Sequence, residues 1–168
     1  MASAATKKAF GIGLTDAVAL LFVLVVPALS HLTAVPFYLL DPMRLAVLGS
    51  LLVSRSRMNG LVLAVALPLL SFGISGHPVF PKCLVIAAEL SVNVLLFWWL
   101  VRVTRVGLAA FLSILLSKVF YYGLKALVIG TGLMQMELVS TALWVQLVVA
   151  VLISIAFALW WRKDLRAS

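Results

Sequence analysis

Long apolar runs separated by short polar stretches are the feature that most limits how this chain can fold. A helix needs about 20 predominantly apolar residues to cross the hydrocarbon core of a bilayer. Hydrophobic residues make up 65% of the 168 residues, whereas soluble domains are roughly 45–50% apolar. We therefore expect an all-α integral membrane protein.

The apolar runs divide the chain into six predicted transmembrane helices. Their approximate limits are 9–33, 36–54, 60–75, 82–101, 106–133 and 137–161. The second is the least regular, because Pro36 and Pro42 both interrupt helical hydrogen bonding. An irregular stretch to about Pro42 followed by a short helix is the alternative. Six spans with short loops nearly exhaust the chain, so residues 1–168 are expected to form a single transmembrane domain without a separate catalytic domain.

The basic residues orient this six-helix bundle. Nine of the 13 lysines and arginines fall on one side of the predicted spans: Lys7, Lys8, Arg55, Arg57, Arg102, Arg105, Arg162, Lys163 and Arg166. Cytoplasmic loops carry an excess of Lys and Arg, so both termini are predicted to lie in the cytoplasm. The net charge of +8 is thus explained by orientation in a membrane rather than by nucleic-acid binding.

Several polar and charged residues fall inside the predicted spans, where an ionised side chain is costly and by default suggests a functional site. At a helical rise of about 1.5 Å per residue, Glu89 lies about 10 Å below the outer end of its helix and Asn93 about 16 Å below it. Lys125, on the next helix, lies at about 12 Å, close to the depth of Glu89. The candidate ligand-binding residues are Asp41, Arg44, Glu89, Asn93, Lys118, Tyr122, Lys125 and Trp144.

Two interpretations of these residues stay open. Glu89 paired with Lys118 or Lys125, and Asp41 paired with Arg44, would simply hold helices together. Alternatively, the groups line an outward-open pocket. Four basic residues of this region, with Lys82 included, face three acidic residues, with Glu137 included. The excess positive charge would favour a ligand with a carboxylate or phosphate. Both interpretations can hold together.

Other chemistries have little support in the sequence. His31 and His77 lack the spacing of metal ligands. Ser113 and Ser117 have no histidine on a neighbouring turn to activate them as nucleophiles. We therefore expect no bound metal, no cofactor and no catalytic residues.

Two stretches resemble a known family. Gly76–Leu90 is a Gly/Pro-rich loop that leads into a helix bearing Glu89 about two turns later, and a basic pair follows that helix. The second stretch is Ser117-Lys-Val-Phe-Tyr-Tyr-Gly123. The chain resembles the membrane-embedded substrate-binding (S) component of energy-coupling factor (ECF) transporters, which is similar in size, in its six spans with cytoplasmic ends and in its short loops.

The resemblance implies a protein that captures a vitamin or similar micronutrient in the outer half of the membrane. It also implies a transmembrane coupling subunit and two cytoplasmic ATPase subunits, which would carry the ATPase activity. In the family the first helix meets the coupling subunit through an Ala-x-x-x-Ala motif. Here the nearest small-residue faces are Gly13 with Ala17 and Thr15 with Ala19, which suit close helix packing.

Two other classes of function stay open. One is a non-transporting membrane scaffold of envelope or cell-shape assembly. The other is a small membrane enzyme acting on lipid-linked substrates, with Glu89 or Asp41 as the base.

Overall fold

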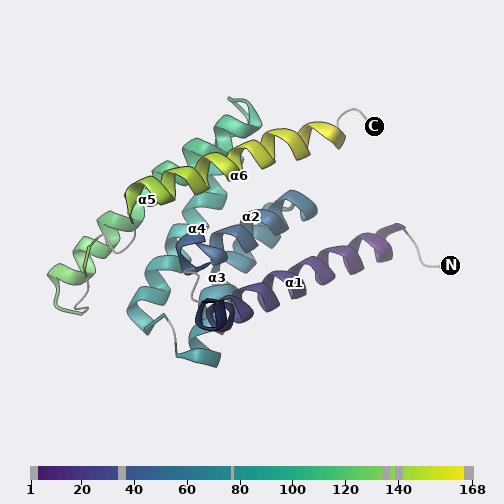
Figure 1. Cartoon of the computed structure of the whole chain (residues 1–168). Helices are drawn as coiled ribbons and strands as arrows, with labels where there is room; N and C mark the ends of the chain where they lie inside the picture. The colour runs from purple at the N-terminus through teal and green to yellow at the C-terminus, as the bar shows by residue number, and fades with distance from the viewer. Residues whose placement is uncertain (1–3, 34–36, 77, 134–136, 139–141, 165–168) are drawn as a thin grey trace.

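The computed structural model describes residues 4–33, 37–76, 78–133, 137–138 and 142–164. Its helices are α1 (Ala4–Thr33), a 3₁₀ helix η1 (Phe37–Leu40), α2 (Pro42–Ser54), α3 (Arg57–Ser75), α4 (Phe80–Leu100), α5 (Val106–Gly130) and α6 (Leu143–Asp164), as Figure 1 shows. The described residues contain no strand. Pro36, His77 and Arg166, which the sequence pattern drew attention to, lie outside them.

Within the described residues, four helices are long and apolar enough to cross a membrane. They are Arg57–Ser75, Phe80–Leu100, Val106–Gly130 and Leu143–Trp161. Large apolar side chains such as Ile74, Val119 and Leu152 point out of the bundle and are mostly exposed, which is the surface expected against lipid rather than water. The chain is thus an α-helical protein with the features of an integral membrane protein. The apolar part of α1 (Gly11–Val26) and the helix α2 are shorter, so six spans with cytoplasmic termini stay a prediction.

The short helix α2 lies at the centre of the packing. Ala46 and Val47 belong to one apolar cluster, which also holds residues of α1, α3 and α4. Leu48 and Leu51 belong to a second cluster, with residues of α4, α5 and α6. α4 packs between α3 and α5, and α5 also packs against α6. The middle of α2 is therefore buried between the two halves of the bundle.

The second predicted segment follows the alternative given above, in which an irregular stretch leads to a short helix near Pro42. A 3₁₀ turn precedes Pro42, and the helix begins at this proline, whose missing N–H costs nothing in a first turn. Asp41 has a left-handed backbone, with φ of 54°, a conformation that few non-glycine residues adopt. The strained backbone brings the Asp41 side chain back over the first turn, where it meets Arg44.

Apart from the start of α2, the helix limits differ most from the predicted ones at the start of α1, which begins at Ala4 rather than at residue 9, and around the last connection. α5 ends at Gly130 and α6 begins only at Leu143. Glu137 and Leu138 are non-helical, so Glu137 does not lie on α6.

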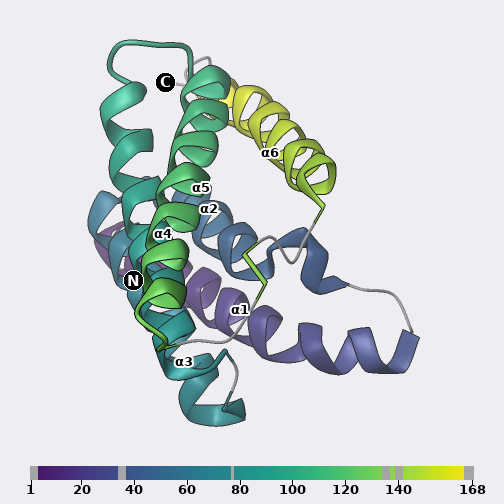
Figure 2. The same ribbon diagram turned by 90° about the vertical axis from the view of Figure 1, so that its left-hand side faces the viewer.

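Helices α5 and α6 touch at one end and separate toward the start of α6 (Figure 2). At the touching end Gly107 packs so closely on α6 that an added Cβ would lie 2.9 Å from the Cβ of Ala158 and 3.1 Å from the carbonyl oxygen of Ser154. Small residues commonly allow such close approach between membrane helices.

A polar cluster that the sequence pattern did not predict joins the first three helices. Asp16 on α1 accepts hydrogen bonds from Ser50 on α2, at 2.6 Å, and from Asn59 on α3, at 3.0 Å. Asn59 also donates to Ser50 at 3.0 Å. This cluster fixes α1 against the bundle and determines which face of α1 is buried.

The predicted partner-binding residues of α1 divide between its two faces. Gly13 and Ala17 are exposed, and nothing lies within 4 Å of a Cβ added to Gly13. Ala19 is buried against α2 and α3, so it packs inside the chain instead. Thr15 is half-buried, and its hydroxyl donates to the carbonyl oxygen of Gly11.

Candidate functional site

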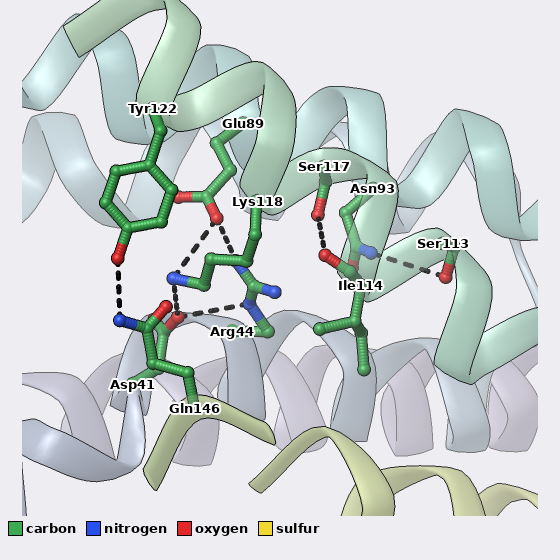
Figure 3. Close-up of polar contacts among 10 residues, drawn as sticks. All are labelled: Asp41, Arg44, Glu89, Asn93, Ser113, Ile114, Ser117, Lys118, Tyr122 and Gln146. Carbon is green, nitrogen blue, oxygen red and sulfur yellow. Dashed lines mark hydrogen bonds and ion pairs between the residues drawn. The ribbon is translucent and has the colours of Figure 1, made fainter. Parts of the chain in front are cut away.

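Four charged side chains form a closed ring of ion pairs between three parts of the chain (Figure 3). Asp41 and Arg44 come from the start of α2, Glu89 from α4 and Lys118 from α5. Arg44 Nε lies 3.1 Å from Asp41 Oδ2, and Arg44 Nη2 donates to Glu89 Oε1. Lys118 Nζ lies 2.9 Å from Asp41 Oδ2 and 3.3 Å from Glu89 Oε1. Each cation therefore contacts both carboxylates.

The ring has a buried side and an open side. Arg44 is 1% exposed and Glu89 3%, whereas the Asp41 and Lys118 side chains retain 30% and 22% of their exposure. Removing an ion from water costs several kcal/mol, and only well-formed contacts with opposite charges compensate for it. The inner Arg44–Glu89 pair therefore depends on its partners, while the outer edge can meet a ligand.

The open side of the ring faces a cavity of about 390 Å³, a size typical of small-molecule sites. The cavity lies between the start of α2 and helices α4, α5 and α6. Its polar lining residues are Asp41, Arg44, Lys82, Glu89, Lys118, Tyr121, Tyr122 and Gln146. Its apolar lining residues are Leu39, Pro42, Met43, Pro78, Ile86, Ile114, Val149 and Ala150.

The cavity carries an excess of one positive charge. Within the ring the two cations balance the two carboxylates, and Lys82 is the third basic residue of the lining. No ion pair joins Lys82 to any residue that the structure describes. In addition, Arg44 Nη1 is buried and has no hydrogen-bond partner within the described part of the chain. Lys82 thus gives the lining a cation that can meet an anion.

A hydrogen bond closes the side of the cavity between α5 and α6. Gln146 Nε2 donates to the hydroxyl of Tyr122 at 2.7 Å, and both side chains line the cavity (Figure 3). Beyond this bond lies a second space of about 370 Å³, a mostly apolar groove between the two helices.

Five of the eight residues expected at a binding site line the cavity: Asp41, Arg44, Glu89, Lys118 and Tyr122. The expected pair Asp41–Arg44 is present. Of the two partners expected for Glu89, Lys118 and Lys125, Lys118 is the one that contacts it. The direct contact of Arg44 with Glu89 was not expected.

Lys125 does not line the cavity and does not pair with Glu89. Its Nζ donates to the backbone carbonyl of Leu138 at 2.9 Å and lies 5.8 Å from the ring centre of Tyr121. Because α5 ends three residues earlier than predicted, Lys125 is nearer the end of the helix, and Lys118 lies opposite Glu89. Lys125 therefore holds the connection to α6 against α5.

Asn93 and Trp144 also lie away from the cavity. Asn93 is fully buried one turn from Glu89, and its Nδ2 donates to Ser113 Oγ at 3.3 Å, which links α4 to α5. Its Oδ1 has no partner within the described residues. Trp144 is 70% exposed and lines the groove between α5 and α6 instead.

Sequence reasoning missed two polar residues, Gln146 at the cavity and Asp16 in the cluster that joins α1, α2 and α3. Gln146 is a lone amide within an apolar run, and Asp16 is a lone carboxylate at the start of one. Either could have been identified from the sequence, because an unpaired polar group in lipid is costly and its presence there indicates a polar partner. Within the described residues, no three His, Cys, Asp or Glu side chains are grouped so that they could hold a metal ion.

Comparison with known proteins gives no match: no family model, no curated protein and no solved structure is similar enough to assign a relative. The function must therefore be argued from the cavity and the bundle themselves.

Proposed function

We propose that the chain is a membrane-embedded binding protein that captures a small anionic solute, as the substrate-binding component of an ECF-type micronutrient transporter. The observation that supports this proposal most strongly is the cavity beside the ion-pair ring. It is large enough for a small molecule, it is reached by the open edge of the ring, and it carries one positive charge in excess.

Lys82 favours an acidic ligand. It lines the cavity and has no anionic partner among the described residues. A carboxylate or phosphate would pair with it, and a hydrogen bond between charged groups contributes roughly 1.5–3 kcal/mol.

The partners would be a transmembrane coupling subunit and two cytoplasmic ATPase subunits, in the plasma membrane of a bacterium. Gly13 and Ala17 lie on a face of α1 that also exposes Leu14, Val18 and Leu21. A helix from a coupling subunit could approach this face closely, because Gly13 and Ala17 present almost no side chain.

A scaffold is the second candidate, and the ring itself is the observation in its favour. All four charged groups have partners within the chain, so the ring could serve only to hold α2, α4 and α5 together. An enzyme with Asp41 or Glu89 as a base fits less well. Each carboxylate already contacts two cations of the ring, so neither is free to take a proton from a substrate.

Ligand-dependent stabilisation of the purified protein separates these candidates. The protein in lipid nanodiscs would be melted with and without a panel of carboxylate- and phosphate-bearing vitamins. We expect at least one compound to raise the melting temperature of the wild type and to have no effect on Lys82→Gln. Arg102→Gln is the matched control, since Arg102 is an exposed cation outside the cavity. Stabilisation that survives Lys82→Gln contradicts binding in this cavity.

A further inference from the structure

The charged cavity continues sideways into the groove between α5 and α6. The two spaces share five lining residues: Ile114, Lys118, Tyr122, Gln146 and Ala150. We propose that the ligand is an amphiphile, with an anionic carboxylate or phosphate head in the cavity and a single apolar chain in the groove. The proposal rests on the proposed function, because the head uses the same cavity.

The groove has the surface of a chain-binding site. Beyond the shared residues it is lined by Leu115, Val119, Leu143, Trp144 and Leu147. All five are exposed apolar side chains. Lys118, Tyr122 and Gln146, the polar residues among the five shared ones, lie where the groove meets the cavity. An apolar chain in the groove would thus begin at the charged ring.

The depth of the ring distinguishes this ligand from an ordinary bilayer lipid. Lys118 is the middle residue of α5, about 18 Å from either end of the helix at 1.5 Å per residue. The head of a bilayer lipid lies at the membrane surface, and moving its charge to this depth is costly unless a protein site receives it. A head held by Lys82 and Lys118 inside the cavity meets that condition, and the same molecule can then place its chain in the groove.

The hydrogen bond between Gln146 and Tyr122 lies where the chain must pass. Both residues border both spaces, and the bond joins α5 to α6. The helices touch at Gly107 and separate toward the start of α6, where the groove lies (Figure 2). Side chains rather than packed backbone therefore separate cavity and groove, and rotation of two side chains would admit a chain laterally.

Photolabelling tests the position of the chain directly. The probe is dodecanoate with a diazirine at the end of its chain, added to the full-length protein in nanodiscs of zwitterionic lipid, and the label is located by peptide mass spectrometry. We expect the label on residues 115–119 and 143–147. An excess of dodecanoate or of dodecyl phosphate should remove it, whereas dodecanol, which lacks a charge, should not.

Matched variants show whether the groove is responsible. Leu147 and Ile155 are both 50% exposed on α6, but only Leu147 lines the groove. Leu147→Trp should reduce labelling about tenfold, which corresponds to about 1.4 kcal/mol, while Ile155→Trp should not change it. Val119→Trp and Leu127→Trp form a second pair on α5, with exposures of 68% and 67%, and only Val119 lines the groove. The second pair keeps the test valid if one variant does not fold.

Three results would either overturn the chain site in the groove or distinguish its failure from a failure of the proposed function. Labelling spread over the lipid-facing side of all helices, equal in Leu147→Trp and Ile155→Trp, overturns the chain site. Groove labelling that persists in Lys82→Gln also overturns it, because the head would then not be held in the cavity. Binding of a short polar anion that is lost in Lys82→Gln but is unaffected by Leu147→Trp refutes the amphiphile and leaves the proposed function intact.

Discussion

Arg44 donates a hydrogen bond to Glu89 across 45 residues of sequence, and both side chains are almost completely buried. The contact ties the short central helix α2 to α4. It is the inner part of a ring whose outer part, Asp41 with Lys118, borders the cavity.

Replacing one of these two residues should destabilise the fold more than replacing both. Arg44→Met leaves Glu89 buried without its nearest cation, and Glu89→Gln leaves Arg44 with one carboxylate fewer. We expect each single variant to lose stability, by about 3–5 kcal/mol where a buried charge is left unpaired. The double variant should regain a large part of that loss. Urea or thermal unfolding in a defined detergent measures the three changes, and additive losses in the double variant would show that the two residues do not interact.

The two lysines of α5 should behave differently. Lys118 borders the cavity, whereas Lys125 donates to the carbonyl of Leu138 and does not. Lys118→Met should therefore weaken binding of an anionic ligand by about tenfold or more. Lys125→Met should lower the melting temperature and leave affinity within about twofold, a difference of less than 0.5 kcal/mol. Titration calorimetry of both variants would decide, and a larger loss of affinity in Lys125→Met would contradict the described site.

Most helix limits, and part of the ring, followed from the sequence. Apolar runs predict the helices because a bilayer requires them, and Pro42 indicated where α2 begins. The pair Asp41–Arg44 followed from the sequence, and so did a lysine of α5 as the partner of Glu89. The choice between Lys118 and Lys125 did not, because an error of three residues at the end of α5 moves every depth by about 4.5 Å.

The Arg44–Glu89 contact could not be predicted from periodicity. It depends on α2 lying between the two apolar clusters of the bundle, and the pattern of a single helix does not determine which neighbour it packs against. Asp16 was missed for a different reason. The first helix was interpreted from its apolar stretch, and the polar partners of Asp16 lie on two other helices.

Close packing of α5 on α6 gives a prediction with an internal control. Gly107→Ala would bring a Cβ to within 2.9 Å of Ala158, and overpacking of this kind typically costs about 1–3 kcal/mol. At Gly123, also on α5, an added Cβ meets nothing within 4 Å. Gly123→Ala should therefore leave stability unchanged or raise it by up to about 1 kcal/mol. Equal melting temperatures for the two variants would contradict the helix contact at Gly107.

The membrane topology is testable by cysteine labelling. Cys83 is buried and would first be replaced by Ala. Ser3→Cys and Ser168→Cys then place single thiols near the two ends of the chain, both outside the described residues. Two cytoplasmic termini predict that an impermeant maleimide labels neither thiol in intact cells and labels both after lysis. Labelling of one end from outside would mean an odd number of spans.

Contact of α1 with a coupling subunit predicts a selective effect of Ala17→Leu. Ala17 is exposed on α1, so a larger side chain there fits the isolated chain but would hold a partner helix away. Co-purification with the coupling subunit should fall, and ligand binding should not. Val18→Ala, at the next and also exposed position, is the control, since a smaller side chain leaves room for the partner. Unchanged complex formation by Ala17→Leu would exclude this face as the contact.

Whether the cavity holds an acidic ligand is tested most directly by identifying what co-purifies with the protein. The wild type and Lys82→Gln would be purified in parallel from the same cells and denatured, and the released small molecules compared by mass spectrometry. Ligand capture predicts a compound with a carboxylate or phosphate, near one per chain in the wild type and at least tenfold lower in Lys82→Gln. Equal amounts of every released compound in the two samples, with both proteins folded, would contradict the proposed site.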